Sequence, residues 1–256
     1  MKLKDKIVFI TGASSGIGEA CAKEFAMLGA KLILCARNIE KLNEVVKQIK
    51  EKNVTDIYVF QLDVRDQAAV KNAVSSLPAE WKNIDILINN AGLAAGLDTI
   101  QDGNIDDWEA MIDTNVKGLL YVTKSILPQM IAKNSGHIIN IGSVAGHQVY
   151  PKGAVYCASK FAVDALTQGL RMDLLGTQIR VTTVDPGAVE TNFSIVRFKG
   201  DTERAAKVYE GMQPLTPEDI ADTIAFCATR KPHVNISEVL IMPTDQAAAT
   251  MVSRKS

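Results

Sequence analysis

The chain has 256 residues, of which 47% are hydrophobic and 22% are charged, and its formal net charge is -1. This length suits one large α/β domain with an ample core, and the balanced charge provides no basic field to attract nucleic acid or anionic lipid. The charged N-terminus leads into only a short apolar run, unlike a secretion signal or a membrane span. We therefore expect a single cytoplasmic domain over residues 1–256 that binds neither nucleic acid nor membrane.

Apolar runs of strand length alternate with longer segments of helical periodicity, a pattern typical of repeated βαβ units. The predicted strands cover residues 6–11, 31–36, 56–62, 84–89, 136–141, 179–184 and 236–242. The predicted helices cover residues 16–28, 39–52, 67–77, 107–132, 154–175 and 217–229. The order predicts an α/β fold of Rossmann type, a doubly wound parallel sheet of about seven strands with helices on both faces. Residues 190–213 interrupt the alternation, and we expect an inserted helical flap there, near the active site.

A glycine-rich turn follows the first predicted strand and opens the first predicted helix. Glycines in such a turn let the backbone approach a pyrophosphate, while the helix N-terminus supplies N–H donors and partial positive charge. The spacing GxxxGxG differs from the usual GxGxxG, so a plain tight turn is the competing interpretation. The residues predicted to bind a dinucleotide here are Gly12, Ser14, Ser15, Gly16, Ile17 and Gly18.

The two residues that directly follow the second predicted strand help to predict which dinucleotide binds. Arg37 and Asn38 stand where NAD-preferring folds carry an acidic residue for the ribose hydroxyls. A guanidinium there can pair with a 2'-phosphate, which favours NADP(H) over NAD. The alternative is a solvated arginine at a strand end.

Residues after the third and fourth strands extend the predicted cofactor cleft, because ligands of open α/β sheets bind beyond the carboxyl ends of the strands. Asp63 and Val64 follow the third strand, where Asp63 is placed to bind an adenine, and Asn90, Ala91 and Gly92 follow the fourth. The small residues of the latter turn allow close backbone approach. Asn89 and Asn90 are also candidates for a purely structural role that fixes adjacent loops.

Tyr156 and Lys160 carry the predicted chemistry, since positions i and i+4 share one face of a helix. An ammonium beside a phenol favours the phenolate and would lower the tyrosine pKa toward a range useful for proton transfer. Ser143, just past the fifth strand, is placed to donate a hydrogen bond to the substrate oxygen. A YxxxK pattern alone occurs by chance in many helices. It becomes informative here because it follows the other motifs in a fixed order along the chain.

The ordered motifs TGASSGIG, NNAG, Asn115, Ser143, YCASK and DPG resemble the short-chain dehydrogenase/reductase family over residues 6–242. The resemblance implies that Tyr156 is the general acid in reduction and the general base in oxidation, and that Ser143 holds the substrate oxygen. It implies that Lys160 binds the nicotinamide ribose and that Asn115 helps to hold a proton-relaying water. It also extends the cofactor site, which Tyr156 and Lys160 share, to Pro186, Gly187, Val189 and Thr191. A homotetramer built from residues 107–132 and 154–175 is expected.

Within that family, residues 150–153, 189–201 and 242–247 look most similar to the NADP-dependent 3-hydroxy acid dehydrogenases, which include serine and allo-threonine dehydrogenases. The resemblance implies oxidation of the β-hydroxyl of short 3-hydroxy acids. Such substrates carry a carboxylate, for which Arg197 is the first candidate partner, ahead of Lys199 and Lys152. The alternatives are a broad NADPH-dependent carbonyl reductase for ketones, aldehydes or diketones, a redox-sensing regulator without turnover, and a structural subunit.

No metal site is expected. The four cysteines lie in apolar surroundings without a CxxC pair and away from the histidines, which predicts buried free thiols in a reducing compartment. His147 lies near the predicted cleft but has no cysteine or carboxylate at metal-ligand spacing along the chain. It is expected to be an ordinary loop residue.

Overall fold

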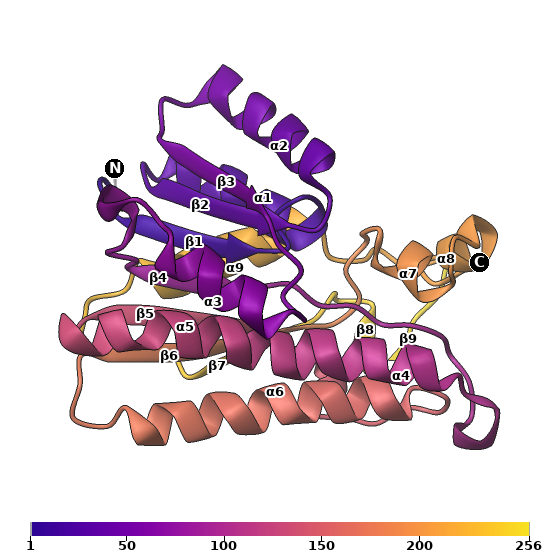
Figure 1. Ribbon diagram of the computed structural model, residues 1–256. Helices are drawn as coiled ribbons and strands as arrows, with labels where there is room; N and C mark the ends of the chain where they lie inside the picture. The colour runs from indigo at the N-terminus through magenta and orange to yellow at the C-terminus, as the bar shows by residue number, and fades with distance from the viewer. Residues whose placement is uncertain (1, 256) are drawn as a thin grey trace.

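A seven-stranded parallel sheet in the order β3-β2-β1-β4-β5-β6-β7 forms the centre of the computed structural model, which describes residues 2–255 (Figure 1). The order reverses after β3, so that β1 and β4 are neighbours. The strands are β1 (Ile7–Thr11), β2 (Lys31–Ala36), β3 (Ile57–Gln61), β4 (Ile86–Asn89), β5 (Gly136–Ile141), β6 (Ile179–Pro186) and β7 (Glu238–Ile241). The predicted doubly wound sheet is confirmed, with every strand within three residues of its predicted bounds.

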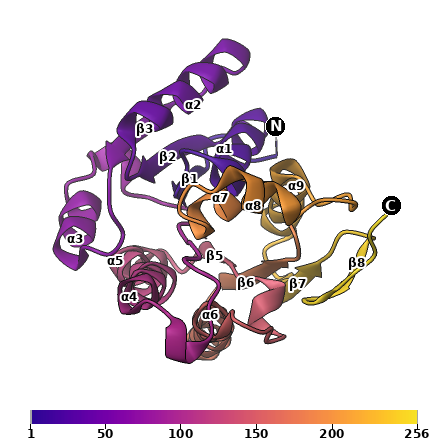
Figure 2. The same ribbon diagram turned by 90° about the vertical axis from the view of Figure 1, so that its right-hand side faces the viewer.

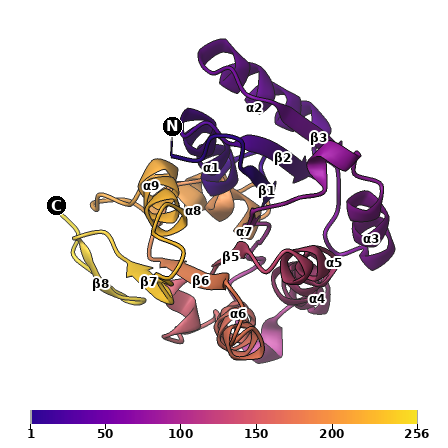
Figure 3. The ribbon, with the colours of Figure 1, turned by 90° about the vertical axis from the view of Figure 1, so that its left-hand side faces the viewer.

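The central strands are buried because helices cover both faces of the sheet (Figures 2 and 3). All five residues of β1 are buried, which explains its continuous apolar run. One face packs against α1 (Gly16–Met27), α2 (Ile39–Lys52) and α9 (Pro217–Ala228), and the other against α3 (Gln67–Ser75), α5 (Leu119–Ala132) and α6 (Ala154–Asp173). The two hydrophobic cores fix the sheet and therefore the relative positions of the loops at its carboxyl edge.

The segment predicted as one helix over residues 107–132 is divided. It consists of α4 (Ile105–Ile112), a π-helical stretch over Asp113–Gly118, and α5. A π-helical turn is a wider insertion that commonly marks a functional site, and it leaves no trace in apolar periodicity. Asn115 lies in the middle of this stretch.

Residues 190–213 form two short helices, α7 (Phe193–Arg197) and α8 (Thr202–Lys207), beyond the end of β6 (Figure 1). We call residues 190–213 the flap. A small antiparallel pair, β8 (Gln246–Ala248) and β9 (Met251–Val252), follows β7 and was not expected from the sequence. No helix within residues 2–255 has the length and apolar character needed to cross a membrane. All four cysteines are buried and free, as predicted.

Candidate active site

The glycine-rich turn between β1 and α1 has backbone geometry that other residues would not tolerate. Gly12 has a φ of +66° and Gly16 a φ of +55°, both in the left-handed region. A Cβ on Gly18 would lie 2.4 Å from the Gly12 carbonyl oxygen. The turn therefore needs glycine at each position, and it brings the start of α1 directly against the end of β1.

The N-terminus of α1 has free backbone donors. Ser15 is its N-cap residue and makes no side-chain capping hydrogen bond within the described chain. Uncapped N–H groups and the helix dipole together favour an anion at this end. The Asn90 side chain holds the turn in place by donating to the carbonyl oxygens of Thr11 and Gly12 at 2.9 and 3.2 Å. This arrangement fits a pyrophosphate.

The two asparagines after β4 have structural partners. The buried Asn89 amide donates to Thr123 Oγ1 and Asn140 Oδ1, both at 2.9 Å, and thereby joins β4 to α5 and β5. Asn90 fastens the glycine-rich turn. The structural role left open for both side chains is thus observed, and Ala91 and Gly92 supply the open backbone beside them.

The charged and polar residues after β2 and β3 lie at the same edge. Arg37 is exposed, whereas the Asn38 side chain caps α2 by accepting from Lys41 N at 2.7 Å. Asp63 forms a bidentate pair with Arg65, at 2.6 Å between Nη2 and Oδ2, and this pair holds the Asp63 pKa below its usual value. The Val64 side chain is buried against Gly118. Arg37 is thus the basic side chain of this group that remains available to a phosphate.

Tyr156 and Lys160 share one face of α6, as predicted, and both are buried. Lys160 Nζ lies 6.0 Å from the centroid of the Tyr156 ring and donates one hydrogen bond to the Ile141 carbonyl at 2.8 Å. Ser143 Oγ accepts a hydrogen bond from Ala145 N at 3.1 Å. Because the serine oxygen is already an acceptor there, its O–H remains to donate to a ligand.

The lowering of the Tyr156 pKa expected from Lys160 is not observed. Burial raises the pKa of the Tyr156 phenol above its ordinary value, and the Ser143 hydroxyl and the Arg197 guanidinium only partly oppose this. Burial also lowers the pKa of Lys160 to about 8, although Asp185 acts in the opposite direction. Desolvation outweighs the ammonium because the ammonium is 6.0 Å from the ring and is itself buried.

Asn115 links the loop after β4 to the catalytic helix. Its Oδ1 accepts from Leu93 N at 2.8 Å, and its Nδ2 donates to Leu93 O at 2.8 Å and to Ser159 Oγ at 3.0 Å. Ser159 in turn donates to the Tyr156 carbonyl at 2.7 Å. Asn115 thus ties the π-helical stretch to the helix turn that carries Tyr156 and Lys160.

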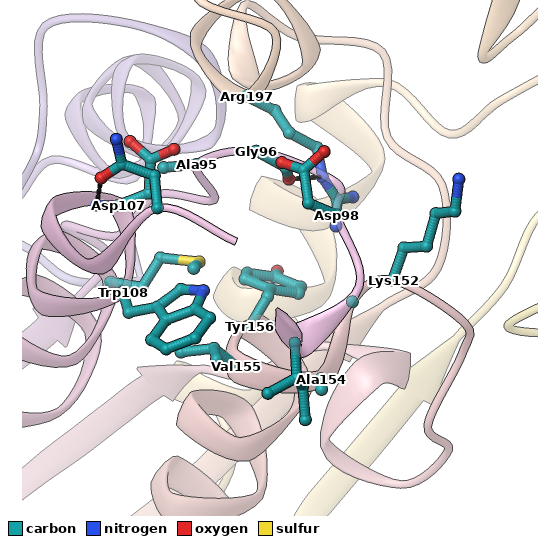
Figure 4. Close-up of a pocket in the computed structure, with 14 residues that line it drawn as sticks. Ala95, Gly96, Asp98, Asp107, Trp108, Lys152, Ala154, Val155, Tyr156 and Arg197 are labelled. Carbon is teal, nitrogen blue, oxygen red and sulfur yellow. Dashed lines mark hydrogen bonds between the residues drawn. The ribbon is translucent and has the colours of Figure 1, made fainter. Parts of the chain in front are cut away.

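The flap contributes the charged group nearest to the tyrosine. The Arg197 guanidinium lies 5.4 Å from the centroids of both the Tyr156 and the Tyr150 rings, and its Nη2 donates to Tyr150 Oη at 2.5 Å. Figure 4 shows Tyr156 facing a pocket between Arg197 and Trp108. A guanidinium over the acid/base group can hold a carboxylate within reach of it.

Further contacts hold the flap onto the body of the protein. Gly96 N donates to the Arg197 carbonyl at 2.9 Å, and Lys199 pairs with Asp107 at 2.9 Å. The Phe193 ring packs edge to face on Tyr156, with centroids 5.6 Å apart. Lys199 is therefore engaged elsewhere, and Lys152 is exposed at the pocket rim. Of the three candidate cations, Arg197 is the one that lies over Tyr156.

The residues after β6 lie between the glycine-rich turn and the flap. Gly187 N bonds to the Ile241 carbonyl at 2.8 Å, directly after Pro186, and Val189 forms an isolated bridge with Leu215. The Thr191 side chain stands beside Gly16, 3.4 Å from where a Cβ on that glycine would lie. Thr191 thus faces the N-terminus of α1.

Several residues around the pocket were not identified from the sequence. Tyr150 orients Arg197, Phe193 covers Tyr156, and Asp98, Asp107 and Trp108 line the pocket wall. No motif marks these residues, because their partners are more than 35 positions away along the chain. The aromatic and basic content of the flap was the available signal.

Comparison with known proteins gives a consistent result. The family model described as short chain dehydrogenase matches residues 6–201. An NADP-dependent 3-hydroxy acid dehydrogenase of Schizosaccharomyces pombe is 46% identical over 255 residues, 99% of this chain and 98% of the relative. The NADP-dependent 3-hydroxy acid dehydrogenase YdfG of Escherichia coli K12 is 47% identical over 244 residues, 95% of this chain and 97% of that protein. A structure described as the closed form of serine dehydrogenase complexed with NADP+ superposes with a TM-score of 0.92 at 45% identity, covering 98% of this chain and 100% of the other.

Proposed function

The chain belongs to the short-chain dehydrogenase family, and from that premise we propose that it oxidises the β-hydroxyl of short 3-hydroxy acids with NADP+ and reduces the matching semialdehydes or keto acids. The observation that carries the substrate class is the Arg197 guanidinium 5.4 Å from the Tyr156 ring centroid. It pairs a carboxylate-binding group with the acid/base residue in one pocket. Relatives described as 3-hydroxy acid and serine dehydrogenases support the same substrate class.

NADP(H), when bound, supplies the hydride acceptor or donor. The chain provides a fitting site: the glycine-rich turn and the N-terminus of α1 would hold the pyrophosphate, and Arg37 would pair with the 2'-phosphate. Asp63 and Val64 would bind the adenine end, and Ala91 and Gly92 would leave room for the backbone to approach the cofactor. Lys160 retains two ammonium donors for the nicotinamide ribose beyond its bond to Ile141. Gly187, Val189 and Thr191 would hold the nicotinamide end.

Tyr156 moves the proton. In oxidation the deprotonated oxygen of Tyr156 accepts the proton of the β-hydroxyl, and in reduction the protonated phenol gives a proton to the carbonyl oxygen. Ser143 donates its free O–H to the same oxygen and stabilises the charge that develops there. Asn115 positions the turn that carries Tyr156, and we assign to it the relay of protons through a water. Arg197 would hold the substrate carboxylate so that the β-hydroxyl lies within reach of Tyr156.

We also place the protein in the cytoplasm as a homotetramer. Large apolar side chains are exposed on the two helices expected to form the subunit contacts. They are Leu120 and Ile131 on α5 and Phe161 and Met172 on α6, between 40% and 73% exposed. Exposed apolar groups gathered on adjacent helices favour association of identical subunits.

The test follows reduced-cofactor absorbance with purified protein, supplying NADP+ or NAD+ together with L-serine, L-allo-threonine, 3-hydroxypropionate, 3-hydroxyisobutyrate or butan-2-ol. We expect turnover of the hydroxy acids with NADP+ and little with NAD+. Turnover of butan-2-ol without turnover of any acid would retain the dehydrogenase and replace the hydroxy-acid assignment with the broad carbonyl reductase. Absence of turnover with every substrate in both directions would refute the catalytic assignment.

A further inference from the structure

Three side chains with metal-ligating atoms meet at the carboxyl edge of the sheet, on the side away from the glycine-rich turn. His147 comes from the loop after β5, Asp185 from the end of β6, and Glu238 from the start of β7. His147 Nε2 lies 3.3 Å from Asp185 Oδ2 and 3.8 Å from Glu238 Oε1, and all three ligand atoms lie within 4.8 Å of one another. His147 is therefore more than the ordinary loop residue expected from the sequence.

Two of these atoms, Asp185 Oδ2 and His147 Nε2, are buried and lie against each other. Asp185 is 1% exposed, and its Oδ1 accepts a hydrogen bond from Thr183 Oγ1 at 2.8 Å. Its Oδ2 contacts His147 Nε2 at 3.3 Å, and within residues 2–255 neither of these two atoms has a hydrogen bond of good geometry to any other group. A buried carboxylate oxygen whose one polar neighbour is a histidine nitrogen has no hydrogen-bond donor from the backbone, and native structures often place an ion or a water at such an atom. This oxygen faces the other two ligand atoms.

We propose that His147, Asp185 and Glu238 bind a divalent transition-metal ion of the Zn²⁺ class. Ligand atoms about 2.0–2.2 Å from a tetrahedral ion are separated from one another by roughly 3.3–3.6 Å. The 3.3 Å separation of His147 Nε2 from Asp185 Oδ2 falls within this range, and the 3.8 Å separation from Glu238 Oε1 lies slightly above it, so a small side-chain adjustment would complete the geometry. The His147 and Glu238 side chains are 23% and 43% exposed, so the fourth position opens to solvent and takes a water.

The charges at the site balance a divalent ion. A neutral imidazole and two carboxylates sum to a charge of -2. Burial raises the pKa of the Asp185 carboxyl, and a bound cation would stabilise its ionised form. The Arg171 guanidinium is engaged with the Val181 and Ser237 carbonyls, whereas Lys160 interacts with the Asp185 charge although burial lowers the Lys160 pKa to about 8.

The ligand set selects the class of ion. One imidazole nitrogen with two carboxylate oxygens suits Zn²⁺ and its first-row neighbours, whereas Mg²⁺ and Ca²⁺ prefer oxygen ligands alone. The ion would join the loop that carries Ser143 to the edge strand β7. Its structural effect is therefore to restrain residues 143–148 beside the active site. The inference does not rest on the proposed substrate.

Zinc titration of the full-length protein after treatment with EDTA tests the site by calorimetry. We expect one ion per chain, with affinity reduced at least about tenfold in both His147→Gln and Glu238→Gln. His233→Gln is the matched control, because His233 is exposed and outside the three-residue cluster, and it should bind zinc like the parent protein. Absence of zinc binding by the parent protein would overturn the proposal.

Two further measurements separate this site from adventitious binding and from misfolding. Hydrogen exchange over residues 143–148 should slow on adding Zn²⁺ to the parent protein and stay unchanged in Glu238→Gln, which retains the side-chain shape. Co²⁺ bound in place of zinc should give the visible absorption of a low-coordinate nitrogen and oxygen site, and Asp185→Asn should remove it. If His147→Gln, Glu238→Gln and Asp185→Asn all bound zinc as tightly as the parent protein, the ion would lie elsewhere and the proposal would be refuted.

Discussion

The glycine-rich turn and the flap lie at the same edge of the sheet but are built in opposite ways. The turn consists of consecutive residues whose backbone forms the binding surface, with Gly12 and Gly16 at positive φ and the start of α1 as the anion site. The flap depends on side chains from distant segments, where Arg197 meets Tyr150 and the Gly96 carbonyl. The first site is therefore local in sequence and the second is not.

Because one region is built from backbone and the other from side chains, we expect them to have different functions. A backbone cradle binds any pyrophosphate and leaves little room for variation, so it defines the family rather than the substrate. A side-chain clamp on a short insertion can change its partner by single substitutions, because surface segments vary more readily than the elements that they connect. The reaction type is thus assigned to the sheet edge, and the proposed substrate class depends on Arg197 in the flap.

Tyr156→Phe should cause the largest effect, because it removes the proton-transfer group and leaves both regions in place. We expect turnover to fall by about 10²–10⁴-fold or more, with NADPH binding nearly unchanged. Fluorescence of bound NADPH measures the binding, and absorbance assays measure turnover. Substantial turnover in the variant would require a different acid and base.

Gly18→Ala tests whether the cradle is a backbone site. A Cβ there would lie 2.4 Å from the Gly12 carbonyl oxygen, and forcing the turn apart costs about 1–3 kcal/mol. Affinity should fall about 10- to 100-fold for NADP+ and NAD+ alike. Gly169→Ala in α6 is the matched control, since a Cβ there meets nothing within 4 Å, and it should stabilise the protein slightly. Equal cofactor affinity in Gly18→Ala and Gly169→Ala would show that the glycine-rich turn does not form part of the cofactor site.

Arg37→Ala examines the side-chain part of the cofactor site. Loss of a charge-assisted contact worth about 1.5–3 kcal/mol should weaken NADP+ binding about 10- to 100-fold and leave NAD+ binding almost unaffected. Dissociation constants for the two cofactors measure the ratio. A similar loss for both cofactors would show that Arg37 does not contact the 2'-phosphate.

Arg197→Lys tests the substrate clamp while keeping the charge. The lysine cannot reproduce the planar fork, so KM for hydroxy acids should rise about tenfold. The rate with butan-2-ol, which lacks a carboxylate, should change little. Lys199→Met serves as the control, because Lys199 pairs with Asp107 and should matter less to KM. A uniform loss on acids and alcohol alike would indicate that Arg197 acts only by holding the flap closed.

Features formed by neighbouring residues could be predicted from the sequence, whereas features formed by distant residues could not. The seven strands, the glycine-rich turn and the positions of Tyr156, Lys160 and Ser143 follow from local patterns, and the structure confirms their placement. The π-helical stretch at Asp113–Gly118 could not be predicted, because the apolar face continues through it. His147, Asp185 and Glu238 come from separate elements, so their spacing along the chain could not predict that they lie together. The raised pKa of Tyr156 depends on burial, which the i and i+4 spacing does not reveal.

That raised pKa supports the most sensitive test of the division between the two regions. Oxidation requires the tyrosine as a base, so oxidative kcat/KM should rise with pH well into the alkaline range, because burial places the Tyr156 pKa above its ordinary value. Reduction requires the protonated tyrosine and should stay level over the same range. Arg197 lowers this pKa through its charge, so Arg197→Met should move the oxidative rise to still higher pH when measured with butan-2-ol. An unshifted profile would confine Arg197 to substrate binding, whereas a shift toward lower pH would contradict the assigned charge effect. A shift toward higher pH would mean that the flap sets both which substrate binds and the pH at which Tyr156 can accept its proton.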